Sequence, residues 1–226
     1  DETLSCLKWL GKNRTEKNSI VITANSEGAR ALGFSEASII PFPESVGGRY
    51  SIWSPISLTA GIENNFMSFL QGGGMADNLL SENSADARKY QKLIKTLAFS
   101  DIWHSNFCNK KNRVVLIYNW KLRSFVNYIQ QLEMESLGKP SNAESIFHET
   151  GQTIFGGFGS TAQHSYFQLL HQGTSQCSVD IIHSPTAQSP LSNAQAKGQA
   201  SLLSSPQKQS SDLRELTNGN IPVNLF

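Results

Sequence analysis

Short runs of apolar and β-branched residues alternate along this chain with longer segments of helical character. The clearest run is Arg113-Val-Val-Leu-Ile-Tyr118, which is apolar after its first residue, as expected of a strand buried on both faces. Strands that alternate with helices are typical of a parallel sheet, because connections between parallel strands are long enough to hold a helix. The alternation therefore predicts an α/β fold, a three-layer sandwich in which helices cover both faces of a five-stranded, mainly parallel sheet.

Apolar periodicity and capping signals locate the predicted elements. Ser54-Pro55 marks the start of one helix, and Gly138 and Pro140 mark the end of another. No internal repeat or long linker interrupts the pattern, so residues 1–226 are expected to form a single domain. Strands are expected at about residues 19–24, 37–42, 113–118, 151–155 and 177–182, and helices at about 2–12, 54–62, 64–80, 86–107, 120–136, from 160, and after 184.

Charge and cysteine content exclude several classes of partner. The formal charge of +1 gives no electrostatic basis for binding nucleic acid or a membrane, and no apolar run approaches the roughly 20 residues of a membrane span. Cys6, Cys108 and Cys177 are odd in number and form no CxxC pair, which favours a reduced, cytoplasmic protein. His104 and Cys108 have a spacing that can hold a metal, but two ligands alone favour ordinary helix packing. We therefore expect no metal, no nucleic-acid partner and no membrane partner.

Three segments contain residues that could bind a ligand or take part in catalysis. The first is Ser45-Val-Gly-Gly-Arg-Tyr-Ser51. Adjacent glycines let the backbone approach a ligand closely and turn N–H groups towards an anion. Arg49 stays charged at every working pH and can hold an oxyanion in a fixed geometry. An ordinary turn with a solvated arginine is the alternative.

The second segment is Gln131-Leu-Glu-Met-Glu-Ser-Leu-Gly-Lys139, at the end of a predicted helix. A carboxylate in a last helical turn faces the negative end of the helix dipole, which raises its pKa towards the range of a general base. Glu133 and Glu135 are two residues apart and are expected to point to different sides of the helix. The alternative is that both are solvated surface acids.

The third segment, from Gly156 to Gly173, combines glycines with two histidines. The glycine-rich run Gly156-Gly-Phe-Gly159 predicts a turn, and Ser160 to Gln163 has the pattern of a capping box that starts the next helix. His164 would then lie in the first helical turn, where the dipole favours neutral imidazole that can exchange protons. His171 is expected to have a structural role. No GK[ST] follows the glycines, so a nucleotide site is not predicted.

Together these stretches resemble the phosphoglucose isomerase family. SVGGRYSIWSPISL (residues 45–58) is similar to a signature of that family, EMESLGK (133–139) to its catalytic-glutamate motif, and GSTAQHSYFQLLHQGT (159–174) to its catalytic-histidine helix. They occur in the family's order, and weaker similarity extends from Glu2-Thr3 to Gly219-Asn220. The resemblance implies a SIS-like, flavodoxin-like fold, with residues 1–226 as the second SIS-type domain excised from a larger two-domain enzyme.

The resemblance also implies an activity, the interconversion of glucose 6-phosphate and fructose 6-phosphate in glycolysis and gluconeogenesis. Such an aldose–ketose isomerase uses no metal or organic cofactor. Glu135 would move a proton between sugar carbons 1 and 2 through an enediolate, while Arg49 and the backbone of Gly48 would stabilise its negative oxygen. His164 would assist ring opening and would reach the site from the partner subunit of a homodimer.

Further positions match the family or depart from it. Gln131 matches a substrate-contacting glutamine, and Thr3 matches the last hydroxyl of the phosphate-binding loop. Most of that loop would precede Thr3, and the catalytic lysine would follow Phe226, so these 226 residues alone are expected to be inactive. The departures are Leu137 for the usual Asn, Gly156-Gly-Phe-Gly159 for Gly-Glu-Pro-Gly, and Gly219-Asn-Ile-Pro222 for Gly-Asn-Arg-Pro.

Two other functions remain open. A regulatory SIS domain would bind a sugar phosphate without turnover, although the presence of Glu135, Arg49 and His164 together argues against a sensor. A secreted signalling protein on the same fold finds no support in targeting features.

Overall fold

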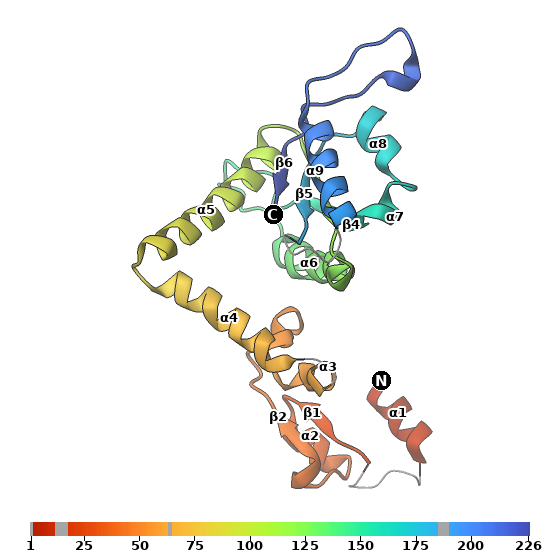
Figure 1. The fold of residues 1–226 in the computed structure, drawn as a ribbon. Helices are drawn as coiled ribbons and strands as arrows, with labels where there is room; N and C mark the ends of the chain where they lie inside the picture. The colour runs from red at the N-terminus through yellow and green to blue at the C-terminus, as the bar shows by residue number, and fades with distance from the viewer. Residues whose placement is uncertain (1, 12–17, 63–64, 185–189) are drawn as a thin grey trace. The chain divides into compact units, whose positions relative to one another are not determined.

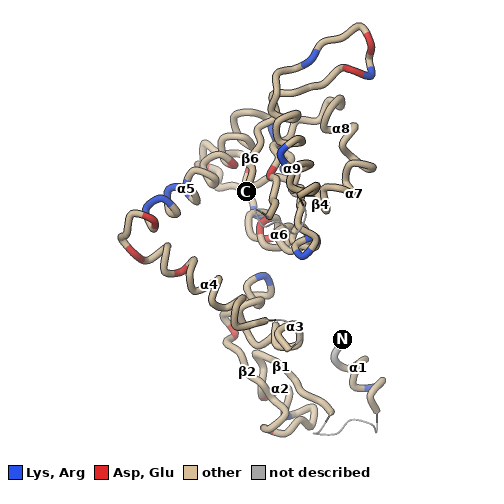
Figure 2. The backbone as a smooth tube through the Cα atoms, viewed as in Figure 1, with Lys and Arg blue, Asp and Glu red and all other residues tan. Residues whose placement is uncertain are grey.

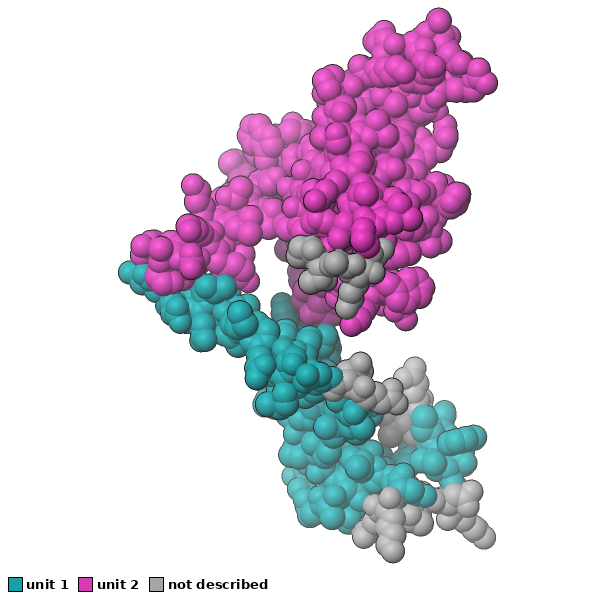
Figure 3. Space-filling view, in the orientation of Figure 1, with its two compact units in different colours: residues 1–83 teal, residues 84–226 magenta. Residues whose placement is uncertain are grey.

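The computed structural model describes residues 2–11, 18–62, 65–184 and 190–226. They divide into two compact units, Asp1–Asn83 (unit 1) and Ser84–Phe226 (unit 2), shown in different colours in Figure 3. The single domain expected over residues 1–226 stays a prediction.

Unit 1 contains a small parallel sheet and several helices (Figure 1). Strands β1 (Val21–Thr23) and β2 (Ile39–Pro41) pair in parallel, with Val21 opposite Ile39. Asparagine side chains cap two helices: Asn25 accepts a hydrogen bond from Gly28 N over 2.8 Å, and Asn65 accepts one from Ser68 N over 3.1 Å. The helices are α1 (Glu2–Leu10), α2 (Ser26–Ala31), α3 (Leu58–Ile62) and α4 (Phe66–Ser81), with 3₁₀ turns at Glu36–Ser38, Gly48–Trp53 and Pro55–Ser57.

Unit 2 is built around a four-stranded parallel sheet in the order β4-β3-β5-β6. The central strand β3 pairs with both β4 and β5, and it lies in the run predicted to be a buried strand. The strands are β3 (Asn112–Ile117), β4 (Thr153–Phe158), β5 (Cys177–Ile182) and β6 (Val223–Leu225). The helical segments are α5 (Ala85–Asn106), η5 (Trp120–Leu122), α6 (Phe125–Ile129), η6 (Gln130–Glu135), α7 (Gly159–Ala162), α8 (Phe167–Gln172), α9 (Pro190–Ser204) and η7 (Leu213–Glu215).

Two hydrophobic clusters cover the two faces of this sheet. Val114 and Leu116 belong to the first cluster, with residues from α7, α8 and α9, and Val115 and Ile117 belong to the second, with residues from α6. Because alternate residues of a strand point to opposite faces, the two clusters lie on opposite sides of the sheet. This arrangement gives the predicted layers, with helices on both faces (Figure 1).

The α/β class is therefore confirmed, but the strand count is not. The described residues form six strands, two in unit 1 and four in unit 2, instead of five in one sheet. The missed strand, β6, directly follows Pro222 and has the polar Asn224 between its two apolar residues, so no continuous apolar run marks it. Hydrogen bonds identify it instead: Val179 N donates to Pro222 O over 2.9 Å, and Phe226 N donates to Ile181 O over 2.8 Å.

The glycine-rich turn and the capping box predicted after it are wrong. Strand β4 continues through both glycines to Phe158, and α7 starts at Gly159 without a side-chain cap. The Ser160 hydroxyl donates to Gln195 Oε1 over 3.2 Å instead of capping the helix. The glycines are needed for close packing, because a Cβ on Gly156 would lie 2.0 Å from Val115 O, and one on Gly159 would lie 2.3 Å from the Tyr118 ring.

We expect Gly156→Ala to lower the free energy of unfolding by about 1–3 kcal/mol, because the added methyl group would overlap the backbone of β3. Gly198→Ala is the matched control: it lies in α9, has no atom within 4 Å of its added Cβ, and should stabilise by up to about 1 kcal/mol. Urea denaturation measures both. Equal effects of the two substitutions would contradict the tight approach of β4 to β3.

Charges of both signs are scattered along the chain, in line with the small net charge (Figure 2). Several Lys and Arg positions lie in the first half of α5, coloured blue in Figure 2; they are Arg88, Lys89, Lys92 and Lys95. In the described part of the chain, no helix combines the length and apolar character that crossing a bilayer requires.

Candidate functional site

The segment from Gln130 to Glu135 forms a π-helical turn, η6, that directly continues α6. The sequence predicted one regular helix over residues 120–136, whereas the structure passes from a 3₁₀ turn through α6 into this wider turn. π-Helical turns are rare within helices and are frequent at functional sites. The turn contains both Glu135 and Gln131, so the structure brings these two predicted site residues together.

Two side-chain contacts with strand β4 hold the π turn against the sheet. Gln130 Nε2 donates to Ile154 O over 2.8 Å, and Ile154 N donates to Met134 Sδ over 3.4 Å. Gln131 and Glu135 are exposed, whereas Glu133 is partly buried. The predicted divergence of Glu133 and Glu135 is therefore confirmed: one faces the body of unit 2 and the other faces solvent.

A buried arginine, which the sequence analysis missed, binds the π turn to the sheet. The Arg113 side chain is only 8% exposed, and its guanidinium lies 2.6 Å from Asp101 Oδ2, 2.5 Å from Glu133 Oε1 and 3.5 Å from Asp180 Oδ2. The 3.5 Å contact is an ion pair without hydrogen-bond alignment, since Arg113 Nε has no hydrogen-bond partner among the residues that the structure describes. Asn224 Nδ2 donates to Asp180 Oδ1 over 2.8 Å. We call Arg113, Asp101, Glu133 and Asp180 the Arg113 cluster.

Three carboxylates around one guanidinium leave an excess of negative charge in the Arg113 cluster. The pKa of Asp101 is raised to about 6, chiefly by burial; the nearby Asp180 and Glu133 also raise it, and Arg113 partly opposes them. A signal was present in the sequence: an arginine opens an otherwise apolar strand, and a buried cation requires nearby carboxylates. Asp180, within the fifth predicted strand, supplies one of them.

The raised pKa of Asp101 predicts a pH-dependent stability. The folded pKa of about 6 exceeds the unfolded pKa of about 3.9, so the folded state binds the proton more tightly. The stabilisation that this proton gives the folded state is lost as pH rises from about 4 to 7. Asp101→Asn removes the titration. The free energy of unfolding of the variant minus that of the wild type should therefore increase from pH 4.5 to pH 7 in urea denaturation. A constant difference would contradict the raised pKa.

His164 lies in a turn between α7 and α8, and its side chain is exposed. The prediction that it occupies the first turn of a capped helix is wrong. Helix α7 has four residues and ends before His164, and α8 begins only at Phe167. Phe167 is buried in the first hydrophobic cluster, with Tyr166 packed against it, and this packing accounts for the break between the helices. The dipole argument for a neutral His164 therefore does not apply.

His164 and Glu135 lie on opposite faces of the sheet in unit 2. Ala162 and Phe167, which flank His164, belong to the first cluster. Ile129 and Ile154, beside the π turn, belong to the second cluster. Within one copy of unit 2 the sheet therefore separates the two side chains.

The remaining predicted site residues lie in unit 1. Gly48 and Arg49 open the 3₁₀ turn Gly48–Trp53, in which Ser51 Oγ donates to Gly48 O over 2.6 Å. A Cβ on Gly48 would meet no atom of the described residues within 4 Å, so among these residues the backbone is open to an approaching ligand. The Arg49 guanidinium carbon lies 5.8 Å from the centre of the Tyr50 ring. Thr3 lies in α1. A shared site of Arg49 with Glu135 stays a prediction.

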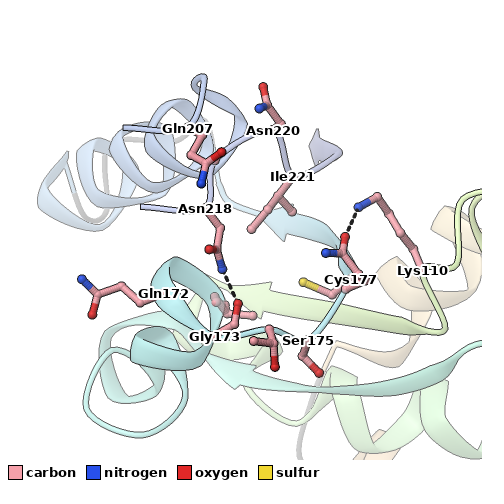
Figure 4. Close-up of a pocket in the computed structure, with 13 residues that line it drawn as sticks. Lys110, Gln172, Gly173, Ser175, Cys177, Gln207, Asn218, Asn220 and Ile221 are labelled. Carbon is pink, nitrogen blue, oxygen red and sulfur yellow. Dashed lines mark hydrogen bonds between the residues drawn. The ribbon is translucent and has the colours of Figure 1, made fainter. Parts of the chain in front are cut away.

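A cavity of about 540 Å³ opens in unit 2 at the amino ends of β3 and β5 (Figure 4). None of the predicted site residues lines it. Several of its polar groups bind one another: Lys110 Nζ donates to Gln176 Oε1 over 3.0 Å, and Asn218 Nδ2 donates to Gly173 O. We therefore place the candidate site at the π turn rather than in this cavity. Among the described residues, no group of three or more His, Cys, Asp or Glu side chains is arranged to hold a metal ion.

A parallel sheet with helices on both faces places the chain in the three-layer class of α/β proteins. A family model described as "Phosphoglucose isomerase" matches residues 3–216. The chain belongs to the phosphoglucose isomerase family.

Relatives with curated names support the same family. A glucose-6-phosphate isomerase of Shewanella amazonensis is 36% identical over 200 residues, covering 84% of this chain and 36% of that protein. One of Shewanella baltica (strain OS195) is 33% identical over 238 aligned residues, covering 98% of this chain and 43% of that protein. The chain thus spans less than half the length of these relatives.

Solved structures support the fold. The crystal structure of a glucose-6-phosphate isomerase from Chlamydia trachomatis matches with a TM-score of 0.70 at 23% identity, covering 99% of this chain and 52% of that one. A hypothetical protein from Thermus thermophilus matches with a TM-score of 0.71 at 19% identity, covering 99% of this chain and 55% of that one.

Proposed function

We propose that this chain carries the proton-transfer residue of a glucose-6-phosphate isomerase, which interconverts glucose 6-phosphate and fructose 6-phosphate in glycolysis and gluconeogenesis. The observation that supports this role most directly is the π turn, which presents Glu135 and Gln131 to solvent while Gln130, Glu133 and Met134 connect it to the sheet. A general base needs such a fixed position, because proton transfer depends on reach and alignment.

The proposed reaction moves one proton between neighbouring carbons. In the open-chain aldose, the Glu135 carboxylate takes the proton from carbon 2, the C–H electron pair forms the carbon 1–carbon 2 double bond, and the carbonyl electrons move to oxygen 1. Arg49 and the Gly48 N–H would stabilise this negative oxygen. The proton of oxygen 2 then passes to oxygen 1 and oxygen 2 becomes the ketone oxygen, while the electron pair of the carbon 1–carbon 2 double bond takes the proton of Glu135 at carbon 1. No electron acceptor is needed, since the product is an isomer.

We propose further that Gln131 and Thr3 contact the substrate and that His164 assists ring opening. The position of His164, on the sheet face opposite to Glu135, supports a site that receives its histidine from the partner subunit of a homodimer. We also propose a cytoplasmic location, supported by the free thiols of Cys6, Cys108 and Cys177.

An assay of the full-length protein tests the proposed activity. Glucose 6-phosphate labelled with deuterium at carbon 2 should yield fructose 6-phosphate, and part of the label should appear in water, because a carboxylic acid exchanges its proton with solvent. Tight binding of either hexose phosphate without turnover would favour the regulatory SIS domain instead.

A further inference from the structure

We infer that Glu133, held by Arg113, is a positioning residue that fixes the rotation of the π turn so that Glu135 faces the substrate. The inference rests on the proposed role of Glu135. Neither Glu133 nor Arg113 touches the substrate in this proposal. They act through the backbone that carries the base.

The first step of the argument is the direction of the side chains. Glu133 lies midway along the chain between Gln131 and Glu135, and at helical spacing a residue two positions away points to the other side. Glu133 Oε1 indeed lies 2.5 Å from the buried Arg113 Nη2, while Gln131 and Glu135 are exposed. A rotation of the turn that moved Glu133 away from Arg113 would also move Glu135.

The second step is the rigidity of the anchor. Arg113 is part of the central strand, where it stands opposite Ile154 of β4 and Ser178 of β5. Its guanidinium is also held by Asp101 from α5 and by Asp180 from β5. Arg113 is therefore a cation fixed to the sheet, and Glu133 connects it to the π turn.

The third step is charge balance. Asp101 and Asp180 already supply two carboxylates for the single positive charge of Arg113, so neutralisation does not require Glu133. The added carboxylate brings excess negative charge into a partly buried site, and this lowers stability. We therefore take its benefit to be the fixed geometry that its hydrogen bond gives the π turn. A charge-assisted hydrogen bond fixes both distance and direction, and this is what a base-carrying turn needs.

The test shortens this connection in the full-length protein. Glu133→Asp keeps the charge but removes one methylene, so the π turn must shift or the contact must lengthen. We expect kcat to fall about 10-fold or more, because small misplacements of a catalytic group are costly, while KM changes less than about 3-fold. Glu133→Gln keeps the length and an acceptor oxygen for Arg113, and it should retain kcat within about 3-fold of the wild type.

Glu149→Asp is the matched control. Glu149 also pairs with a basic residue near the start of β3, since its Oε1 lies 2.7 Å from Lys111 Nζ, and it is 36% exposed against 34% for Glu133. It lies outside the π turn, so both kinetic constants should stay within about 2-fold of the wild type.

The outcomes separate this inference from the proposed function. If Glu135→Gln is inactive but Glu133→Asp keeps kcat within 2-fold, the positioning role is wrong and the proposed function stands. A fall in kcat that merely follows the loss of folded protein, measured by thermal unfolding, also overturns the positioning role. Turnover by Glu135→Gln overturns the proposed function itself.

Discussion

Glu135→Gln in the full-length protein should lower kcat for isomerisation by about 10³-fold, because the amide cannot accept the proton from the sugar carbon. Glutamine has nearly the same shape and polarity, and Glu135 is exposed, so folding should be preserved. The dissociation constant for fructose 6-phosphate should change less than about 3-fold, since the carboxylate acts on the reacting carbons rather than on the phosphate. Steady-state kinetics and isothermal titration calorimetry measure the two effects.

Glu144→Gln provides the control for this loss of activity. Glu144 is another exposed glutamate of unit 2, in the loop between the π turn and β4, and its substitution should leave kcat unchanged. Retention of more than a tenth of the wild-type kcat by Glu135→Gln would remove Glu135 from the role of base. Loss of fructose 6-phosphate binding by the same variant would instead indicate a binding role.

Long, strongly patterned elements could be predicted from the sequence. The apolar run at residues 113–118 is the central strand, and the helix expected at residues 86–107 is α5. Such elements are predictable because burial on both faces, or on one helical stripe, leaves a pattern over many residues. Strand β6 has only three residues and is held by pairing with β5, so local sequence carries no comparable pattern for it.

The segment around His164 shows how tertiary packing overrides a local signal. Ser160 fits a capping pattern, yet its hydroxyl binds Gln195, 35 residues away in the sequence. The glycines before it fit a turn, yet Gly156 serves the close approach of two strands. Neither partner is visible from within the segment itself.

The candidate site was only partly accessible from sequence. The separation of Glu133 from Glu135 follows from helical spacing alone. The π turn does not, because Gln130 and Met134 contact Ile154 in the neighbouring strand, and the local sequence does not reveal that partner. The Arg113 cluster joins a helix, two strands and the π turn, so its members are scattered widely along the sequence.

Two inactive variants of the full-length protein should restore activity when they are mixed. If Glu135 and His164 of one site come from different subunits, a heterodimer of Glu135→Gln and His164→Ala has one site with both substitutions and one intact site. Random exchange makes about half of the dimers heterodimers, so activity should recover to about a quarter of the wild-type level. The variants are unfolded together, refolded and assayed for isomerisation.

The same experiment discriminates between the two possible origins of the histidine. If both residues of a site came from one subunit, every site of the heterodimer would carry one substitution, and the mixture would stay as inactive as its components. Each variant is also refolded alone, to exclude a gain of activity from refolding itself. A double variant that carries both Glu135→Gln and His164→Ala, mixed with either single variant, should also stay inactive. Recovery in the first mixture alone is the result that we expect, because the sheet lies between Glu135 and His164 within one subunit and a partner subunit would bring the histidine to the base.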